Sequence, residues 1–421
     1  MTRHFWVLLH RFAGLFMAFF LTVAGVTGTI LAFYHELDGW LNPENHQVAI
    51  LNQPMQDDFT LRDIALALMP QADIPMIGLK REPGQVYEAN LVPQIDPATG
   101  KSYELGYQTI RINPYTGELI NFGKDDGFWP LTRHNLLGFI YSLHYSLALG
   151  DVGVWLFGIA ALIWTIDCFV AFYLTLPVRR RESLYPSPFP DGDVNHQRGF
   201  WSRWAIAWKI KWPTSVFRLA FDLHRAGGLW TCLMLFVFAW SSVGFNLPNQ
   251  VYQPVMETFF EMPDLANYPI ANLPQPRPDP RIDWRNALAI ARRLMAEQAQ
   301  NHGFNVLQEQ AVAYQSEKGL FVYLVRSDLD ISHEGGSTLI WFDGDSGEFV
   351  RLLMPTGQAS GLTITMWLST LHMAGIWGLP YKIFVCLMGL VVAMLSVTGV
   401  YIWWKKRRVA RQKSKYLACR A

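Results

Sequence analysis

The sequence predicts an α-helical integral membrane protein: four transmembrane helices from two tandem repeats, each repeat with a small external α+β domain. Hydrophobic residues make up 51% of the 421 residues and charged residues only 16%, whereas about 25% of residues are charged in soluble proteins. Four long stretches carry almost no formal charge, and the two halves resemble each other. This composition argues against a disordered chain, a soluble cytosolic enzyme or a nucleic-acid partner.

The first apolar stretch runs between Arg11 and Glu36 and contains 24 residues without a formal charge. At 1.5 Å per residue, it is long enough to cross a hydrocarbon core of about 30 Å. It is also too long for the apolar region of a signal peptide, so we expect it to be retained. The other three stretches are 152–178, interrupted only by Asp167, then 226–248 and 383–404.

Positive charge marks the cytoplasmic side. The 179–225 connection has nine basic and four acidic residues, and the 405–420 tail has eight basic and no acidic residues. The long segments 36–151 and 248–382 together have 16 basic and 29 acidic residues. By the positive-inside rule, we expect a multi-pass protein in a lipid bilayer with both termini cytoplasmic and both long segments outside.

Two pairs of motifs reveal the duplication. LHRFAGL at 9–15 matches LHRAGGL at 223–229, and SLHYSLALG at 142–150 matches TLHMAGIWG at 370–378. Each first motif begins a span and each second motif precedes one. Because two spans per repeat preserve the orientation, the repeats should be related by an axis along the membrane normal.

The external segments share one design. The first has a helical pattern at 61–69, a strand pattern at 107–112 and turn residues in NPYTGELI at 113–120. The second has a helical pattern at 285–298, a strand pattern at 321–327 and turn residues within 339–350.

The predicted parts follow from these patterns. They are a first transmembrane helix (1–35), a first external domain (36–133), an outer interfacial helix with the second transmembrane helix (134–178), a cytoplasmic loop (179–222), a third transmembrane helix (223–248), a second external domain (249–355), another outer interfacial helix with the fourth transmembrane helix (356–404), and a basic cytoplasmic tail (405–421).

Three shorter segments have a recognisable character. Proline-rich stretches at 183–193 and 271–280 predict extended linkers. Trp201, Trp204, Trp208 and Trp212 recur every three to four residues. This spacing predicts either an amphipathic helix on the inner membrane interface or a loop helix packed on the bundle.

The cysteines offer no external disulfide. Cys168, Cys232 and Cys386 fall within predicted spans, and Cys419 lies in the tail. The motif C-x-x-C-H is absent from the sequence, so a haem, if bound, is not attached covalently through that motif.

Four histidines fall at matched depths. His10 and His224 lie at the cytoplasmic ends of the first and third spans, whereas His144 and His372 precede the second and fourth spans outside. A haem needs two axial donors from opposite faces, and two such pairs predict two non-covalent haems b. Filled axial positions suit electron transfer. The alternatives are interfacial histidines that reach toward the polar headgroups, or a metal such as zinc, for which adjacent Cys or carboxylate ligands are lacking.

Neighbouring residues refine the haem hypothesis. Small residues next to the inner pair would leave room for a flat macrocycle: Gly14, Ala226, Gly227 and Gly228. Arg11 and Arg225 could pair with propionates. His35 and His134 could compete as outer ligands, although neither has a repeat partner. We expect Asp167 to make a structural hydrogen bond, and the alternative is a role in relaying protons. The histidines at 46, 196, 302 and 333 lie in loops or domains and should be solvated.

This combination of motifs resembles the PepSY-associated transmembrane family of inner-membrane proteins associated with iron uptake. The resemblance rests on the two LHR-x-x-G-L openings, the paired Leu-His motifs and the two external segments ending in TGELI and SGEFV. It implies PepSY-like external domains in the periplasm and a bacterial inner membrane. Its characterised relatives include the FoxB-type siderophore reductases, which implies haem on His10 and His224 inside and on His144 and His372 outside.

The leading hypothesis is a dihaem oxidoreductase that passes electrons across the inner membrane and reduces iron in a ferric siderophore so that it is released. The sequence has no G-x-G-x-x-G fingerprint, so the electrons would come from a quinol or a cytoplasmic reductase. The competing hypothesis is a non-enzymatic receptor or accessory transport protein whose PepSY-like domains bind a siderophore, a peptide or a partner protein.

Overall fold

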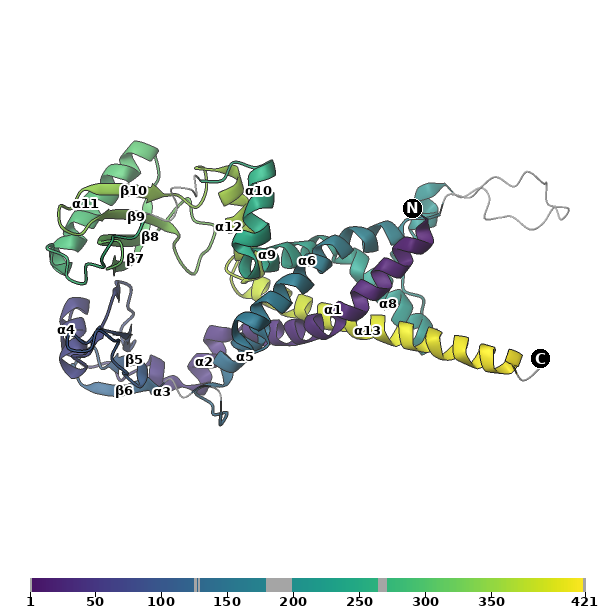
Figure 1. Cartoon of the computed structure of the whole chain (residues 1–421), viewed down its shortest axis with the longest axis horizontal. Coiled ribbons are helices and arrows are strands. Elements are labelled where there is room, and N and C mark those ends of the chain that lie inside the picture. The colour runs from purple at the N-terminus through teal and green to yellow at the C-terminus, as the bar shows by residue number, and fades with distance from the viewer. Residues whose placement is uncertain (1, 125–126, 128, 179–198, 264–270, 419–421) are drawn as a thin grey trace. The chain divides into compact units, whose positions relative to one another are not determined.

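The computed structural model describes residues 2–124, 127, 129–178, 199–263 and 271–418. The chain forms two compact units. Residues 1–32, 139–254 and 379–421 make up the helical unit, and residues 33–138 and 255–378 make up the sheet unit. Figure 1 shows the elements of both.

Three helices of the helical unit are long and apolar enough to cross a membrane, as the sequence predicts. They are α1 (Arg3–Leu31), α6 (Gly150–Thr175) and α13 (Leu379–Ala418). Helix α1 packs against both α6 and α13. At 29 residues, α1 is about 44 Å long, which exceeds the hydrocarbon thickness.

The third predicted span is not one straight helix. It consists of α8 (Val216–Trp230) and α9 (Cys232–Asn246), bent by 72° at their junction. Thr231 leaves helical geometry there, and its hydroxyl donates to the carbonyl of Gly227 at 2.8 Å. Consecutive glycines and a back-bonding threonine are common causes of such a bend. Among the described residues, the helical unit therefore has three candidate spans, or four if this bent pair crosses as one.

Helices α1 and α13 approach each other at backbone distance. A Cβ built on Gly25 would lie 2.6 Å from the carbonyl oxygen of Gly389, and a Cβ on Gly389 would lie 2.6 Å from that of Gly25. The Thr29 hydroxyl also lies 3.2 Å from the Cys386 carbonyl oxygen. Small residues permit such crossings between membrane helices.

The aromatic stripe at 201–212 does not form the predicted amphipathic helix. Helix α7 (Phe200–Trp204) ends at its second tryptophan, and the following residues form turns. Trp204 donates to the Thr175 hydroxyl at 3.2 Å, and Trp230 donates to the Trp208 carbonyl at 3.1 Å. These bonds hold the segment against the bundle. The linker predicted at 183–193 lies outside the described residues, and 271–280 contains no helix or strand.

The first half of the sheet unit contains α2 (Tyr34–Leu41), α3 (Pro43–His46) and α4 (Asp58–Leu68). Strands β3 (Tyr87–Asn90), β5 (Tyr107–Ile112) and β6 (Leu119–Lys124) form an antiparallel sheet in the order β3-β5-β6. Leu61 and Ala65 of α4 pack on this sheet. Two-residue strands β1 (Ala72–Asp73) and β4 (Val92–Pro93) pair with each other.

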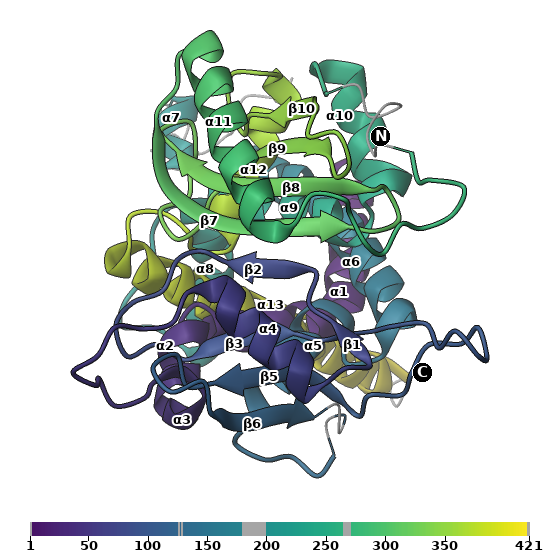
Figure 2. The same cartoon turned by 90° about the vertical axis from the view of Figure 1, so that its left-hand side faces the viewer.

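The second half contains α11 (Trp284–His302) and strands β7 (Val306–Gln315), β8 (Leu320–Ser327), β9 (Thr338–Asp343) and β10 (Phe349–Leu353). Strand β2 (Met76–Gly78) of the first half pairs with β7, which gives a five-stranded sheet in the order β10-β9-β8-β7-β2 (Figure 2). Ile77 of β2 is fully buried in its core. The two segments predicted to be external therefore share one sheet.

Both turn motifs form as their residues predict. Gly117 and Gly347 adopt the left-handed conformation, with φ of +75° and +73°, in the turns before β6 and β10. The predicted helical and strand patterns at 61–69, 107–112, 285–298 and 321–327 correspond to α4, β5, α11 and β8. A short helix also precedes α6 and α13: α5 (Leu136–Ser146) and α12 (Ser360–His372).

The remaining elements connect the units. The π-helix η1 (Pro248–Tyr252) and α10 (Gln253–Phe259) follow α9 along the chain. Tyr252 and Met256 on these elements are buried.

Candidate functional site

A cavity of about 420 Å³ lies among α1, α6, α8, α9 and α13 in the helical unit. Ligand cavities commonly measure roughly 300–1,000 Å³. Most of its lining is apolar, including Val7, Leu15 and Trp164. His10 and His224, predicted as a pair from their matched depths, both line it.

The two imidazole rings lie close to each other. The ring centres of His10 and His224 are 6.1 Å apart, and the ring planes are inclined by 56°. Two imidazole nitrogens bound to one metal ion at about 2.0 Å, each about 1.1 Å from its ring centre, would put the centres about 6.2 Å apart. The observed spacing is therefore compatible with two imidazoles that bind one metal ion.

Hydrogen bonds fix the orientation of both rings. Nδ1 of His10 lies 3.0 and 2.9 Å from the two carboxylate oxygens of Asp167. Nδ1 of His224 lies 2.9 Å from the Leu395 carbonyl oxygen and 3.1 Å from Oγ1 of Thr398. Since a carboxylate and a carbonyl accept, each Nδ1 donates, which leaves Nε2 to bind a metal. Within the described part of the chain, neither Nε2 has a hydrogen-bond partner.

A glycine makes room for the His224 ring. A Cβ built on Gly399 of α13 would lie 3.1 Å from Cε1 of His224. The preceding Thr398 bonds back to the carbonyls of Met394 and Leu395 within its own helix. Its oxygen therefore has a fixed direction when it accepts from His224.

His144 sits in a cradle of the same design on α1. A Cβ on Gly28 would lie 3.0 Å from Cε1 of His144, and Nδ1 of His144 lies 2.9 Å from Oγ1 of Thr27. Thr27 bonds back to Val23 and Ala24. The Ala24 carbonyl also accepts a hydrogen bond from His144.

The two cradles share a sequence motif that the predicted repeat does not reveal. Val-Thr-Gly occurs at 26–28 on α1 and at 397–399 on α13. These two helices do not correspond in the predicted tandem repeat, so comparing the halves in order does not align the motifs. In both, the threonine oxygen and the carbonyl three residues earlier face a histidine Nδ1.

Basic residues also line the cavity. Arg11, predicted as a propionate partner, makes no hydrogen bond or ion pair within the described residues. Arg225, the other predicted partner, lines the cavity as well, but its Nη2 is held by Asp222 at 2.9 Å and by the Ile206 and Lys209 carbonyls. Sequence reasoning missed two cations of the lining, Arg3 and Lys406.

The outer histidines are divided between the units. His144 belongs to the helical unit, whereas His372 ends α12 in the sheet unit. His35 on α2 and His134 before α5 also belong to the sheet unit. The structure thus brings together the inner predicted pair, while the pairing of the outer ligands stays a prediction.

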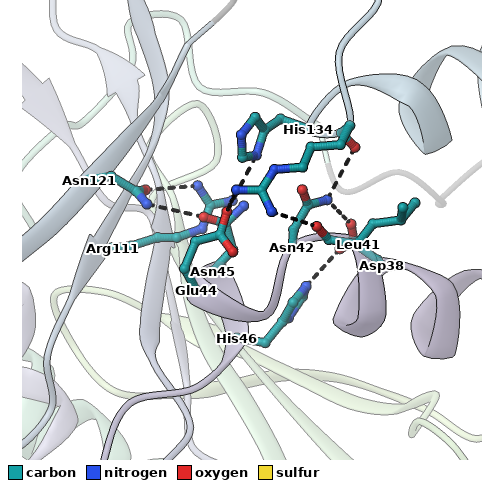
Figure 3. A network of polar contacts seen from close by, with 10 residues as sticks. Asp38, Leu41, Asn42, Glu44, Asn45, His46, Arg111, Asn121 and His134 are labelled. Atoms are coloured by element: carbon teal, nitrogen blue, oxygen red, sulfur yellow. Dashed lines mark hydrogen bonds and ion pairs between the residues drawn. The ribbon is translucent and has the colours of Figure 1, made fainter.

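His134 takes part in a polar network (Figure 3). Its Nδ1 lies 3.8 Å from Glu44, which also accepts from Arg133 at 2.8 Å. Asn42 donates to Asp38, and so does His46 when Nε2 carries the proton, both at 2.8 Å. The network fixes the chain just before α5 against α2 and α3. It gives His134 and His46 structural partners.

Asp167 has a role that the sequence could only outline. Asp167 is 7% exposed, and its carboxylate accepts from His10 on another helix, rather than from Thr165 or Trp164 beside it. No group of three or more His, Cys, Asp or Glu side chains that could hold a metal ion occurs among the described residues. The candidate ligands at this site are therefore the two imidazoles.

Comparison with known families agrees with the architecture. Residues 7–406 match the family described as PepSY-associated TM region. The chain belongs to this family. It is accordingly a multi-pass membrane protein, with helical spans and β-sheet regions between them. A search of curated proteins found no match.

Proposed function

We propose that this protein is a dihaem oxidoreductase of the bacterial inner membrane that transfers electrons to iron held in a ferric siderophore. The observation that carries the proposal is the His10–His224 pair, with ring centres 6.1 Å apart across a cavity. Each ring is oriented through Nδ1 and presents Nε2.

The residues at this site fit a haem. Two imidazoles supply the axial ligands, the apolar lining suits a macrocycle, and Arg11 and Lys406 offer cations for the propionates. When bound, such a haem would supply one-electron transfer. Asp167, Leu395 and Thr398 hold the two rings in place.

His144 supports a second haem at the other end of the bundle, with His372 as its predicted partner. The Val-Thr-Gly cradle orients His144 as the matching motif orients His224. His35 and His134 remain alternatives for the second outer ligand.

The acceptor and the direction rest on the resemblance to siderophore reductases and on the positive-inside rule. Both termini are then cytoplasmic and the sheet unit is periplasmic. The donor is a quinol or a cytoplasmic reductase. Reduction of the ferric siderophore would weaken its hold on iron and release it.

The first experiment is the absorption spectrum of protein purified from haem-replete cells. We expect a Soret band, sharp α and β bands on reduction, and two haems per chain. A colourless preparation would reject this function in favour of a non-enzymatic receptor or accessory transport protein.

The second experiment assigns the ligands. Replacing His10 or His224 with alanine should remove one haem, and replacing His144 or His372 should remove the other. His302, exposed at the end of α11, is the matched control and should leave both. Retention of two haems in all four variants would contradict the ligand assignment.

The third experiment identifies the acceptor. Protein reduced with dithionite should be reoxidised by a ferric siderophore under anaerobic conditions. Failure of every ferric chelate tested to reoxidise it would contradict the substrate class while leaving the haem assignment intact.

A further inference from the structure

Three histidines of the helical unit, His10, His144 and His224, have unequal partners. Nδ1 of His144 and of His224 each faces a neutral carbonyl and a threonine hydroxyl. Nδ1 of His10 instead faces both oxygens of the Asp167 carboxylate, at 3.0 and 2.9 Å. The pair in the cavity is therefore asymmetric.

The sequence repeat shows what Asp167 replaces. Asp167 follows His144 by the same number of residues by which Leu395 follows His372. In the second repeat, the main-chain carbonyl of Leu395 accepts from His224. In the first repeat, the matching position bonds to His10 through a charged side chain. At equivalent positions of the two helices, His224 therefore has a neutral hydrogen-bond acceptor and His10 has an anionic one.

In its surroundings, the Asp167 carboxylate interacts mainly with His10. Asp167 is buried on α6, and no Lys or Arg forms an ion pair with it in the part of the chain that the structure describes. Nearly equal distances from one N–H to both oxygens show that both accept. A charge in a poorly hydrated site acts far more strongly on its neighbour than a charge in water.

We propose that Asp167 is a positioning residue that lowers the reduction potential of the inner haem, the one proposed for His10 and His224. A ligating histidine that donates to a carboxylate becomes a stronger electron donor to its metal. Stronger donation stabilises ferric over ferrous iron, and hydrogen bonding behind the ligand is one of the ways in which a protein tunes a haem.

The inference rests on the proposed function, because it requires a haem at this pair. The experiment is a potentiometric titration of the purified full-length protein, with the electron paramagnetic resonance spectrum of the ferric haems recorded in parallel. Asp167→Asn keeps the size of the side chain and removes its charge. Asp167→Glu keeps the charge. Thr398→Ala removes a neutral hydrogen bond from the opposite ligand and is the matched control.

In Asp167→Asn, we expect the ratio of reduced to oxidised haem at a given solution potential to increase roughly tenfold for one of the two haems. For a one-electron couple, this is a rise of about 59 mV in its midpoint potential. The other potential and its resonance should not move. Thr398→Ala should shift the same haem by much less, and Asp167→Glu should stay near the wild type.

Two haems bound in Asp167→Asn with both potentials unchanged would overturn the role of Asp167 and leave the proposed function standing. Equal shifts of both potentials would also overturn it. If Asp167→Asn loses the haem, Asp167→Glu decides: loss there too means that Asp167 only fits the site, whereas retention at the wild-type potential supports the charge. Wild-type protein without haem would refute both proposals.

Discussion

Gly399 gives the sharpest test of how the inner pair is held. A Cβ at this position would lie 3.1 Å from Cε1 of His224, whereas carbon atoms prefer about 3.5–4.0 Å. The ring must therefore move by about 0.4 Å or more. Such a movement lengthens its bonds to Leu395 and Thr398, now 2.9 and 3.1 Å.

The expected cost of Gly399→Ala follows from these distances. Overpacking of this kind costs about 1–3 kcal/mol. The higher helix propensity of alanine stabilises the fold by about 1 kcal/mol but does not strengthen haem binding. We expect haem affinity at the inner site to fall by roughly 5- to 150-fold, since about 1.4 kcal/mol is a factor of ten. Gly399→Leu should abolish binding there.

The assay is the rate at which each haem transfers to an excess of an apo-haemoprotein acceptor. One of the two haems should leave Gly399→Ala faster, and the other should keep its wild-type rate. Gly138→Ala is the matched control, because a Cβ at this helical glycine meets nothing within 4 Å. Unchanged transfer of both haems in Gly399→Ala would refute the view that the glycine positions the ring.

Three further predictions concern the cap of α4, the crossing of α1 and α13, and a cation of the cavity. Asp57→Ala should lower stability by about 1 kcal/mol through loss of the α4 cap, as thermal unfolding would measure. Burial raises the pKa of Asp57, but hydrogen bonds from Thr60 and Arg285 outweigh this effect and lower the pKa to about 2. The stabilisation by the ionised Asp57 cap should therefore be present above pH 4 and fade as the pH falls toward 2. Gly25→Leu should separate α1 from α13 and reduce the folded yield in detergent, whereas a wild-type yield would contradict the close crossing. Arg11→Gln should weaken binding of the inner haem and speed its transfer to the acceptor. An unchanged transfer rate would count against a contact between Arg11 and a propionate.

Much of the fold is predictable because its signals are local. Apolar length marks α1, α6 and α13, and turn residues such as Gly117 and Gly347 mark hairpins. The bend at Thr231 was missed, because an uncharged stretch has the same composition whether it is straight or broken. The pairing of β2 with β7 was also missed, since a three-residue strand carries almost no periodic signal.

The candidate site divides in the same way. His10 and His224 could be found from a repeated motif, because repeated residues reveal equivalent depth. Asp167 could be recognised as unusual but not assigned, since its partner comes from another helix. Arg225 is committed to Asp222 by contacts that spacing does not reveal.

The crossing of α1 and α13 sets a distance as well as a contact. The two helices touch at Gly25 and Gly389 and run in opposite directions, with N and C at the same end of the helical unit (Figure 1). From this contact, Thr27 lies two residues along α1 and Thr398 lies nine residues along α13 in the opposite sense. At 1.5 Å per residue, the cradles of His144 and His224 are about 16 Å apart along the axis. Because backbone rather than side chains makes the contact, the helix pair should hold this separation nearly constant. In the proposed oxidoreductase, the distance between the two haem sites would then be fixed by the helix crossing.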